Sequence, residues 1–475
     1  MQHAFLIACA LLLIGFIYRV HFRFLQVLYI PASVIGGLVG LILGPYVLGP
    51  RLVESIPIIA NTYNALLPAE AFEILSKWPG WLIAVVFAGL YMEKPARSFK
   101  ESAKLATREG IMVWIIVLGQ MTIGIIACWF LIKPFYEEVP YSFGQLIETG
   151  FAGGHGTAAA MGQVFKSIGF EDGHDLGIFM ATVGLVYSVV SGIVLVNLAV
   201  RRGWTRAGDV QIPIIQGLES RSGEEPAAYE KVRPEVIDPI VFQALILAAA
   251  FGIGFLLSNI VNWWVPQIEG ALLVIATGER MQSFIPDMAE KVKDLPFFIY
   301  TLAGGLIVRE GMHALKIDDL IDIHSIRRLT SAAMEFLIVS AIATLRIEAV
   351  IKMIVPLTIL LVVAFIWCAV CLLWIGRRLL PPEYWFELGI INYGMSTGTT
   401  ATGFMLLRIV DKDLDSGAAE DYALAAPLSA PFIGGGLLTL AMPLILEGAG
   451  VAVPALILVI AMVALFFTGV KLSGR

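Results

Sequence analysis

Long apolar segments follow one another along this chain, and short polar stretches separate them. The segments fall near residues 3–18, 24–48, 79–92, 111–132, 176–200, 242–265, 296–308, 331–345, 353–376, 421–445 and 451–470. A helix needs about 20 predominantly apolar residues to cross a bilayer, so most of these segments are typical of membrane-spanning helices. The pattern therefore predicts an all-α polytopic membrane protein.

Two stretches rich in small residues interrupt this pattern. Residues 148–163 read ETGFAGGHGTAAAMGQ, and residues 387–403 read ELGIINYGMSTGTTATG. Glycine inside a helix costs about 1 kcal/mol relative to alanine, so such runs tend to break. A bilayer tolerates broken backbone only where protein or a water-filled cavity satisfies its polar groups. We expect two re-entrant hairpins, near 143–170 and 387–407, that line a polar cavity of the kind in which secondary transporters hold substrate.

A polar stretch at residues 201–238, with mixed charge and several Pro and Gly breaks, is typical of a linker. It separates an N-terminal half (1–200) from a second half (239–445), and residues 446–475 form an extra helix without a counterpart. The halves match weakly, since Glu148 and Gly150 align with Glu387 and Gly389. Five spans per half is an odd number, so we expect the second repeat to be inverted relative to the first.

Composition excludes a soluble domain, because 58% of the residues are hydrophobic, only 15% are charged and the mean hydropathy is +0.83. The distribution of basic residues predicts the orientation. With the N-terminus outside and neither hairpin counted as a span, most of the 32 Lys and Arg residues, including those of the linker, fall on the cytoplasmic side. The four cysteines lie in apolar segments, which indicates no disulfide framework.

Several motifs resemble those of the bacterial sodium/glutamate symporter family. They are the GGHGT run from Gly153, an IPxxVxGG stretch from Ile30 and an AxxGLV sequence from Ala181. The resemblance, which covers roughly residues 20–445, implies two inverted five-helix repeats, each with a re-entrant hairpin between its fourth and fifth helices. It also implies a homodimer in the bacterial inner membrane that takes up glutamate with sodium, by moving a transport domain against a dimer scaffold.

The hairpins supply the candidate site. Helix N-termini and backbone N–H groups at the tips suit a substrate carboxylate, whereas hydroxyl and carbonyl oxygens suit the sodium ion that the resemblance implies. The predicted substrate-binding residues are Gly153, Gly154, His155, Gly156, Thr157, Asn392, Ser396, Thr397 and Arg346. The predicted sodium ligands are Thr157, Ser396, Thr399 and Thr400. We expect no catalytic residues, no cofactor, no metal besides sodium and no nucleic-acid partner.

Four alternatives stay open. Arg346 pairs a second substrate carboxylate or is an interface arginine that reaches toward water. His155 is a hydrogen-bonded histidine of the pocket or a titrating one. The second hairpin lacks a clean GGxG, so the substrate is glutamate or another organic anion, such as a dicarboxylate or 2-hydroxycarboxylate, carried with sodium or protons. The DDLID stretch has the spacing of a magnesium-diphosphate motif, so a membrane enzyme that uses Asp318, Asp319 and Asp322 is a weaker third reading.

Overall fold

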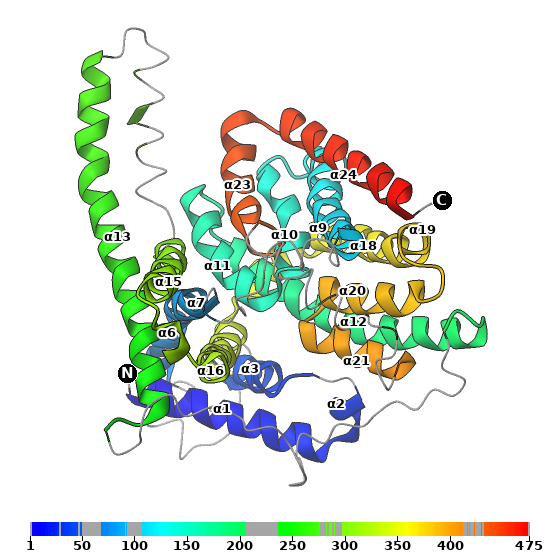
Figure 1. Cartoon of the computed structure of the whole chain (residues 1–475), viewed down its shortest axis with the longest axis horizontal. Helices are drawn as coiled ribbons and strands as arrows, with labels where there is room; N and C mark the ends of the chain where they lie inside the picture. The colour runs from blue at the N-terminus through cyan, green and yellow to red at the C-terminus, as the bar shows by residue number, and fades with distance from the viewer. Residues whose placement is uncertain are drawn as a thin grey trace. The chain divides into compact units, whose positions relative to one another are not determined.

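A computed structural model of the chain describes residues 2–27, 30–45, 48–49, 68–90, 92, 107–205, 236–275, 297–411 and 432–473, with single residues between 282 and 289 and between 416 and 429. All regular elements among these residues are helices, as the sequence predicts (Figure 1). Most of the predicted linker, 206–235, lies outside the described residues. The division into two inverted repeats stays a prediction.

Seven stretches of helix in the described part of the chain are long and apolar enough to cross a membrane. They are α1 (Gln2–His21), Ala69–Gly89 in α6 (Ala69–Leu75) and α7 (Trp78–Leu90), α9 (Thr107–Ala127) with a π-helical end (Cys128–Ile132), α12 (Gly173–Arg201), α13 (Pro239–Ile275), α18 (Ile354–Val370) with a π-helical segment (Cys371–Gly376) and α19 (Arg377–Leu379), and α24 (Ala452–Ser473). The chain is therefore a membrane protein with several spans.

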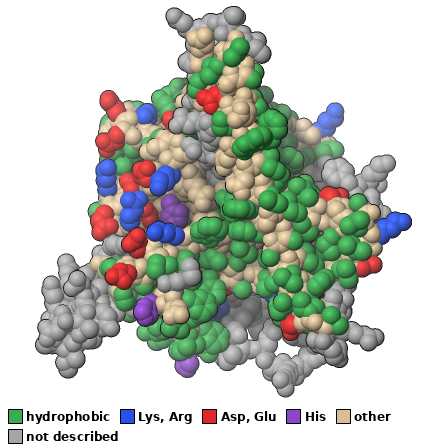
Figure 2. Space-filling view, turned by 90° about the vertical axis from the view of Figure 1, so that its left-hand side faces the viewer, with side chains coloured by type: hydrophobic (Ala, Val, Ile, Leu, Met, Phe, Trp, Pro, Cys, Tyr) green, Lys and Arg blue, Asp and Glu red, His purple; other side chains and the backbone are tan. Residues whose placement is uncertain are grey.

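The surface agrees with this assignment. Large hydrophobic side chains are exposed on many helices, including Phe24 (70%), Trp263 (62%) and Phe467 (65%). Figure 2 shows hydrophobic side chains over much of the visible face. Such extensive apolar exposure is typical of a surface that faces lipid rather than water.

The chain divides into two compact units. One comprises residues 1–76, 97–219 and 338–475, and it contains both small-residue stretches. The other comprises residues 77–96 and 220–337, where α7, α13 and α15 (Phe297–Ala314) pack together. Glycines allow that packing: a Cβ on Gly304 of α15 would lie 2.1 Å from the Ala250 carbonyl oxygen of α13. The Thr301 hydroxyl donates to the Ala84 carbonyl at 2.8 Å.

In the first unit, α1 packs against α3 (Ala32–Leu43), where a Cβ on Gly36 would lie 2.3 Å from the Leu11 carbonyl oxygen. The shorter elements there include α2 (Arg23–Val27), α17 (Ile347–Lys352) and α23 (Leu437–Ala449). The predicted segment 421–445 is described continuously only from residue 432. That part consists of a loop, residues 432–436, followed by α23.

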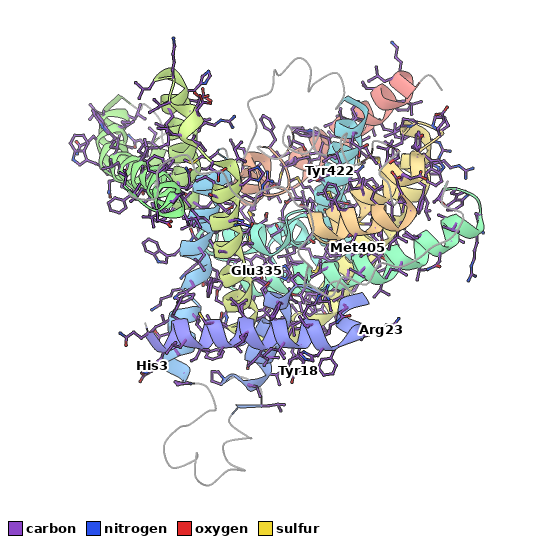
Figure 3. The ribbon with its side chains drawn as sticks, turned by 60° about the horizontal axis from the view of Figure 1, so that its bottom comes forward. His3, Tyr18, Arg23, Glu335, Met405 and Tyr422 are labelled. Atoms are coloured by element: carbon purple, nitrogen blue, oxygen red, sulfur yellow. The ribbon has the colours of Figure 1, made fainter. Side chains whose placement is uncertain are left out.

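One predicted segment is longer than expected. The segment 331–345 belongs to α16, which begins at Ile323 and runs for 21 residues to Ala343. Glu335 lies partway along α16 and is exposed there (Figure 3). The early start has a local cause, because Asp322 caps the helix, as described below.

Candidate functional site

The first small-residue stretch is a broken pair of helices. α10 (Leu146–Gly150) ends, three residues follow, and α11 (Gly154–Ser167) begins; we call α10 and α11 the first broken pair. Gly154 has φ +67°, a conformation that side chains rarely adopt. Gly153 precedes α11 without a side-chain cap, so the first N–H groups of α11 receive no cap from that residue. The break that the glycines predict is therefore present.

The second stretch is also broken. α20 (Trp385–Thr397) and α21 (Thr400–Val410), the second broken pair, are separated by Gly398 and Thr399. The Thr399 hydroxyl accepts the Thr402 N–H at 3.3 Å and so caps α21. The two helices cross closely, since a Cβ on Gly394 would lie 2.6 Å from the Gly403 Cα, and they lie side by side in Figure 1. Thr399, predicted to bind sodium, thus has a structural role as well, and Thr400 is exposed.

The two breaks lie against each other, although 244 positions separate Gly154 from Gly398. A Cβ built on Gly154 would be 3.7 Å from the Gly398 carbonyl oxygen, which is van der Waals contact distance. The structure therefore brings together the glycine breaks of the two stretches from which the site was predicted. It does so with backbone rather than with charged side chains.

Hydroxyl groups join α12 to the second broken pair. The Thr397 hydroxyl hydrogen-bonds the Ser188 hydroxyl at 2.8 Å, and Ser188 in turn donates to the Gly394 carbonyl at 3.0 Å. Gly184, one turn before Ser188, lets Thr397 approach, because a Cβ there would lie 2.7 Å from the Thr397 carbonyl oxygen. Further along, the Ser191 and Tyr393 hydroxyls are 2.6 Å apart. Sequence reasoning identified Thr397 but not its partners on α12.

The polar groups of α9 approach α20. The Gln120 amide donates to the Ser396 carbonyl at 2.7 Å, while the Ser396 hydroxyl donates within its own helix to the Asn392 carbonyl at 2.7 Å. The Asn392 amide donates to Glu109 Oε1 and to the Leu388 carbonyl. Asn392, predicted to bind substrate, is therefore engaged with a buried carboxylate of α9. Gln120 is a polar residue of this region that the sequence analysis missed.

The first broken pair meets a second glycine-rich segment, residues 432–436, which we call the glycine loop. The Thr157 hydroxyl donates to the Gly434 carbonyl at 3.4 Å. Glu148 Oε1 accepts the Gly434 N–H at 2.9 Å and the Thr439 hydroxyl at 2.8 Å. Gly434 and Gly435 have φ of +66° and +102°, so the loop requires glycine at both positions. The loop, Glu148 and Thr439 thus join Thr157 in one polar cluster.

His155 is buried, and its Nε2 lies 3.1 Å from the Thr182 hydroxyl oxygen. The Thr182 hydroxyl donates to the Ile178 carbonyl at 2.9 Å, so its oxygen is left to accept from His155 Nε2–H. This arrangement fits the hydrogen-bonded histidine of the two predicted readings. The described residues contain no group of three or more His, Cys, Asp or Glu side chains able to hold a metal ion.

Arg346 lies elsewhere. Its Nε donates to Asp175 Oδ2 at 2.7 Å and its Nη2 to Asp172 Oδ1 at 3.0 Å. Asp175 is at the start of α12, whereas the second broken pair contacts α12 at Gly184 and Ser188. At about 1.5 Å per helical residue, these contacts are roughly 14–20 Å apart along the axis. The structure does not bring Arg346 together with the breaks, and it gives the side chain acidic partners within the protein.

The DDLID acids have local partners too. Asp322 Oδ2 accepts the N–H of Ser325 at 3.1 Å and its hydroxyl at 2.6 Å, which caps α16. Asp318 accepts from His313 at 3.2 Å, and this hydrogen bond holds the pKa of Asp318 below its ordinary value. Asp319 belongs to a short 3-10 turn, Asp318–Leu320, in which no residue is buried.

Comparison with known proteins finds no matching family model, no similar curated protein and no similar solved structure.

Proposed function

We propose that the chain is a secondary active transporter that takes up a small organic anion, best matched by glutamate, together with sodium. The observation that carries this proposal is the meeting of two glycine breaks, one from each half of the chain, at Gly154 and Gly398. Transporters with inverted repeats use such discontinuous helices to bind substrate and coupling ion. Inside a bilayer, breaks of this kind persist only where protein or a water-filled cavity satisfies their polar backbone groups.

Local features of the two halves support inverted repeats with re-entrant hairpins. A π-helical segment, Cys128–Ile132, precedes the first broken pair, and another, Cys371–Gly376, precedes the second. π-Helical turns are rare and occur often at functional sites. Their matching positions agree with the alignment of Glu148 on Glu387 and with five spans per repeat. The helix α24 then forms an addition to the second repeat.

Contacts between distant segments agree with the predicted orientation. With the N-terminus outside, Arg346 and Asp172 both fall on the outer side, and they form an ion pair. Glu109 and Asn392 both fall toward the cytoplasmic side, and they hydrogen-bond each other. This agreement supports the assignment of the broken pairs as hairpins that enter and leave on one side. The proposed location is the bacterial inner membrane, with the linker cytoplasmic and the protein a homodimer.

In the proposed mechanism, the N-terminal turn of α11 presents backbone N–H groups to a substrate carboxylate, because Gly153 and Gly154 leave that helix end open. Hydroxyl and carbonyl oxygens nearby bind sodium. Alternating access follows if the unit that contains both broken pairs moves as the transport domain relative to a dimer scaffold. Binding of ion and substrate would order the breaks in each orientation.

A different anion, such as a dicarboxylate or 2-hydroxycarboxylate, is the alternative substrate. The second broken pair has one glycine, Gly398, between Thr397 and Thr399, instead of a GGxG run. Hydroxyls at this break would suit a hydroxyl-bearing anion as well as an ammonium group. A membrane enzyme is the weaker candidate, because the Asp322 carboxylate caps α16 and Asp318 pairs with His313.

The test is uptake of labelled glutamate into proteoliposomes, with an inward sodium gradient and with choline in place of sodium. Sodium-dependent accumulation that only glutamate analogues compete would support the proposal in full. Competition by a dicarboxylate or 2-hydroxycarboxylate, without glutamate uptake, would favour the alternative substrate. No transport of any tested anion under either gradient would count against a transporter.

A further inference from the structure

The helix α10 of the first broken pair and the 3-10 turn before it (Tyr141–Gln145) contain buried polar atoms without partners. The side chains of Ser142, Gln145, Glu148 and Thr149 are all fully buried. Among the described residues, the hydroxyls of Ser142 and Thr149, both amide atoms of Gln145 and Glu148 Oε2 have no hydrogen-bond partner. Folded proteins keep few such atoms, and each needs an explanation. Their concentration in one short segment indicates that a polar ligand binds there.

Three of these side chains share one helical face. Gln145 ends the 3-10 turn in right-handed helical backbone that continues into α10, so Glu148 and Thr149, three and four positions later, are its neighbours on the helical surface. The segment is enclosed by neighbouring helices: a Cβ on Gly144 would lie 2.3 Å from the Gly124 carbonyl oxygen of α9, and one on Gly150 would lie 2.6 Å from Met180 Cβ of α12. Bulk water therefore does not reach these polar groups.

The charge of Glu148 is not balanced by the protein. Its Oε1 accepts from two neutral donors, the Gly434 N–H and the Thr439 hydroxyl. No Lys, Arg or His in the described part of the chain forms an ion pair with it. A buried carboxylate without a positive partner requires a bound cation or a proton. One carboxylate among neutral oxygens matches the charge of a monovalent ion.

We propose that Glu148, with the side-chain oxygens of Gln145 and Thr149, binds the coupling sodium ion, an assignment that rests on the proposed transport function. The site differs from the hydroxyls of the second broken pair in having a carboxylate. It is also connected to the break, because Glu148 holds the Gly434 N–H while Thr157 of α11 holds the Gly434 carbonyl. Sodium at Oε2 would keep Glu148 ionised and so keep the glycine loop against the first broken pair.

Thermal unfolding of the purified full-length protein tests the site without requiring transport. Tm is measured against sodium chloride, with choline chloride holding the ionic strength constant. A ligand that binds only the folded state raises Tm with its concentration. We expect Glu148→Gln to lose the sodium-dependent rise, and Thr149→Val to need roughly tenfold more sodium for the same rise. Glu138→Gln, which removes an exposed carboxylate shortly before the segment, should respond as the unchanged protein does.

The outcomes separate the two proposals. A normal sodium response in both Glu148→Gln and Thr149→Val would overturn the site, and Thr149→Val keeps the test valid if Glu148→Gln does not fold. A Tm that depends on pH but not on sodium would mean that Glu148 takes a proton, which also overturns it. Glu148-dependent sodium binding without uptake of any anion would contradict transport alone. Sodium-driven uptake with unchanged sodium dependence in Glu148→Gln would contradict the site alone.

Discussion

At the scale of single residues, the site depends on glycines that admit backbone rather than on side chains that reach substrate. Gly184 is an example, since a Cβ there would lie 2.7 Å from the Thr397 carbonyl oxygen and 2.8 Å from the Phe151 ring. One methyl group would therefore push α12 away from the second broken pair and from the break of the first. Glycine has only a hydrogen atom as its side chain, and this small size lets the two breaks meet.

We expect Gly184→Ala to destabilise the protein by about 1–3 kcal/mol, which is the usual cost of overpacking, and to lower anion uptake at least tenfold. The measurements are Tm in detergent and initial uptake rate in proteoliposomes. Gly252→Ala is the matched control, because Gly252 also lies within a long helix but nothing approaches within 4 Å of a Cβ built there. That control should be neutral or slightly stabilising. Equal effects of the two substitutions would contradict the packing argument.

Residue patterns predicted the breaks but not their partners. Glycine density in 148–163 and 387–403 marks positions where helices end, and helices do end there. The partner of Glu148, Thr439, is 291 positions away, and no local pattern connects them. The glycine loop has a sequence signal in Gly434–Gly436, but the apolar residues around it made 421–445 read as one span. The sequence predicted two alternative roles for Arg346 but not its ion-pair partners Asp172 and Asp175, because they are more than 170 positions away.

At the scale of elements, helix ends decide which acids are available for chemistry. α16 begins at Ile323 because Asp322 accepts backbone N–H groups of the first turn, and Arg327 and Arg328 lie inside the helix. The signal was present in the sequence as an Asp followed three residues later by Ser325. Cap and enzyme readings of this aspartate make different predictions.

Asp322→Ala should cost about 1–2 kcal/mol of stability, as loss of an N-cap usually does, and it should leave no magnesium-dependent activity to lose. Asp319→Ala is the control, because Asp319 belongs to the same motif but does not cap α16. It should change Tm little. Thermal unfolding with and without magnesium gives both results. A magnesium-dependent Tm that both substitutions abolish would support the enzyme instead.

A second contact between elements joins the start of α12 to the backbone before α17. Asp175 has a side chain only 7% exposed, and it accepts both the Arg346 N–H and Nε, whereas the Arg346 side chain is 50% exposed. Removing the arginine leaves a buried carboxylate with less compensation. The pair therefore ties together two segments that are distant in sequence and fall on the same predicted side of the membrane.

We expect Arg346→Gln and Asp175→Asn each to lower stability by about 1–2 kcal/mol, because half of the pair is solvated. The double variant should lose less than the sum, and the difference measures the coupling. Lys352→Gln, at the end of α17, serves as a control for removal of a positive charge nearby. Additive losses would show that Arg346 does not depend on Asp175. A loss of dicarboxylate uptake in Arg346→Gln without a change in Tm would return Arg346 to substrate binding.

At the scale of the whole molecule, orientation follows from whether the broken pairs span the membrane. A re-entrant pair returns the chain to the side from which it entered, whereas a spanning pair reverses every later segment. The seven helices of spanning length do not decide between these topologies, since several further segments are shorter or partly outside the described residues. The distribution of Lys and Arg favours re-entry. This argument counts the basic residues of all loops, so it applies to the topology of the complete chain and not to a single helix.

Labelling single cysteines with a membrane-impermeant maleimide tests re-entry directly, in a background that lacks the four native cysteines. Positions 138 and 171 flank the first broken pair, and positions 383 and 411 flank the second. We expect cysteines at 138 and 171 to react from outside the cell, and those at 383 and 411 to react only after permeabilisation. Opposite accessibility within either pair would mean that this broken pair crosses the membrane. If the first pair crosses, every later segment reverses and most basic loops move to the outer side, against the preference that sets the topology of membrane proteins. If the second pair crosses, only the residues after it reverse, and Lys412, Lys471 and Arg475 move to the outer side.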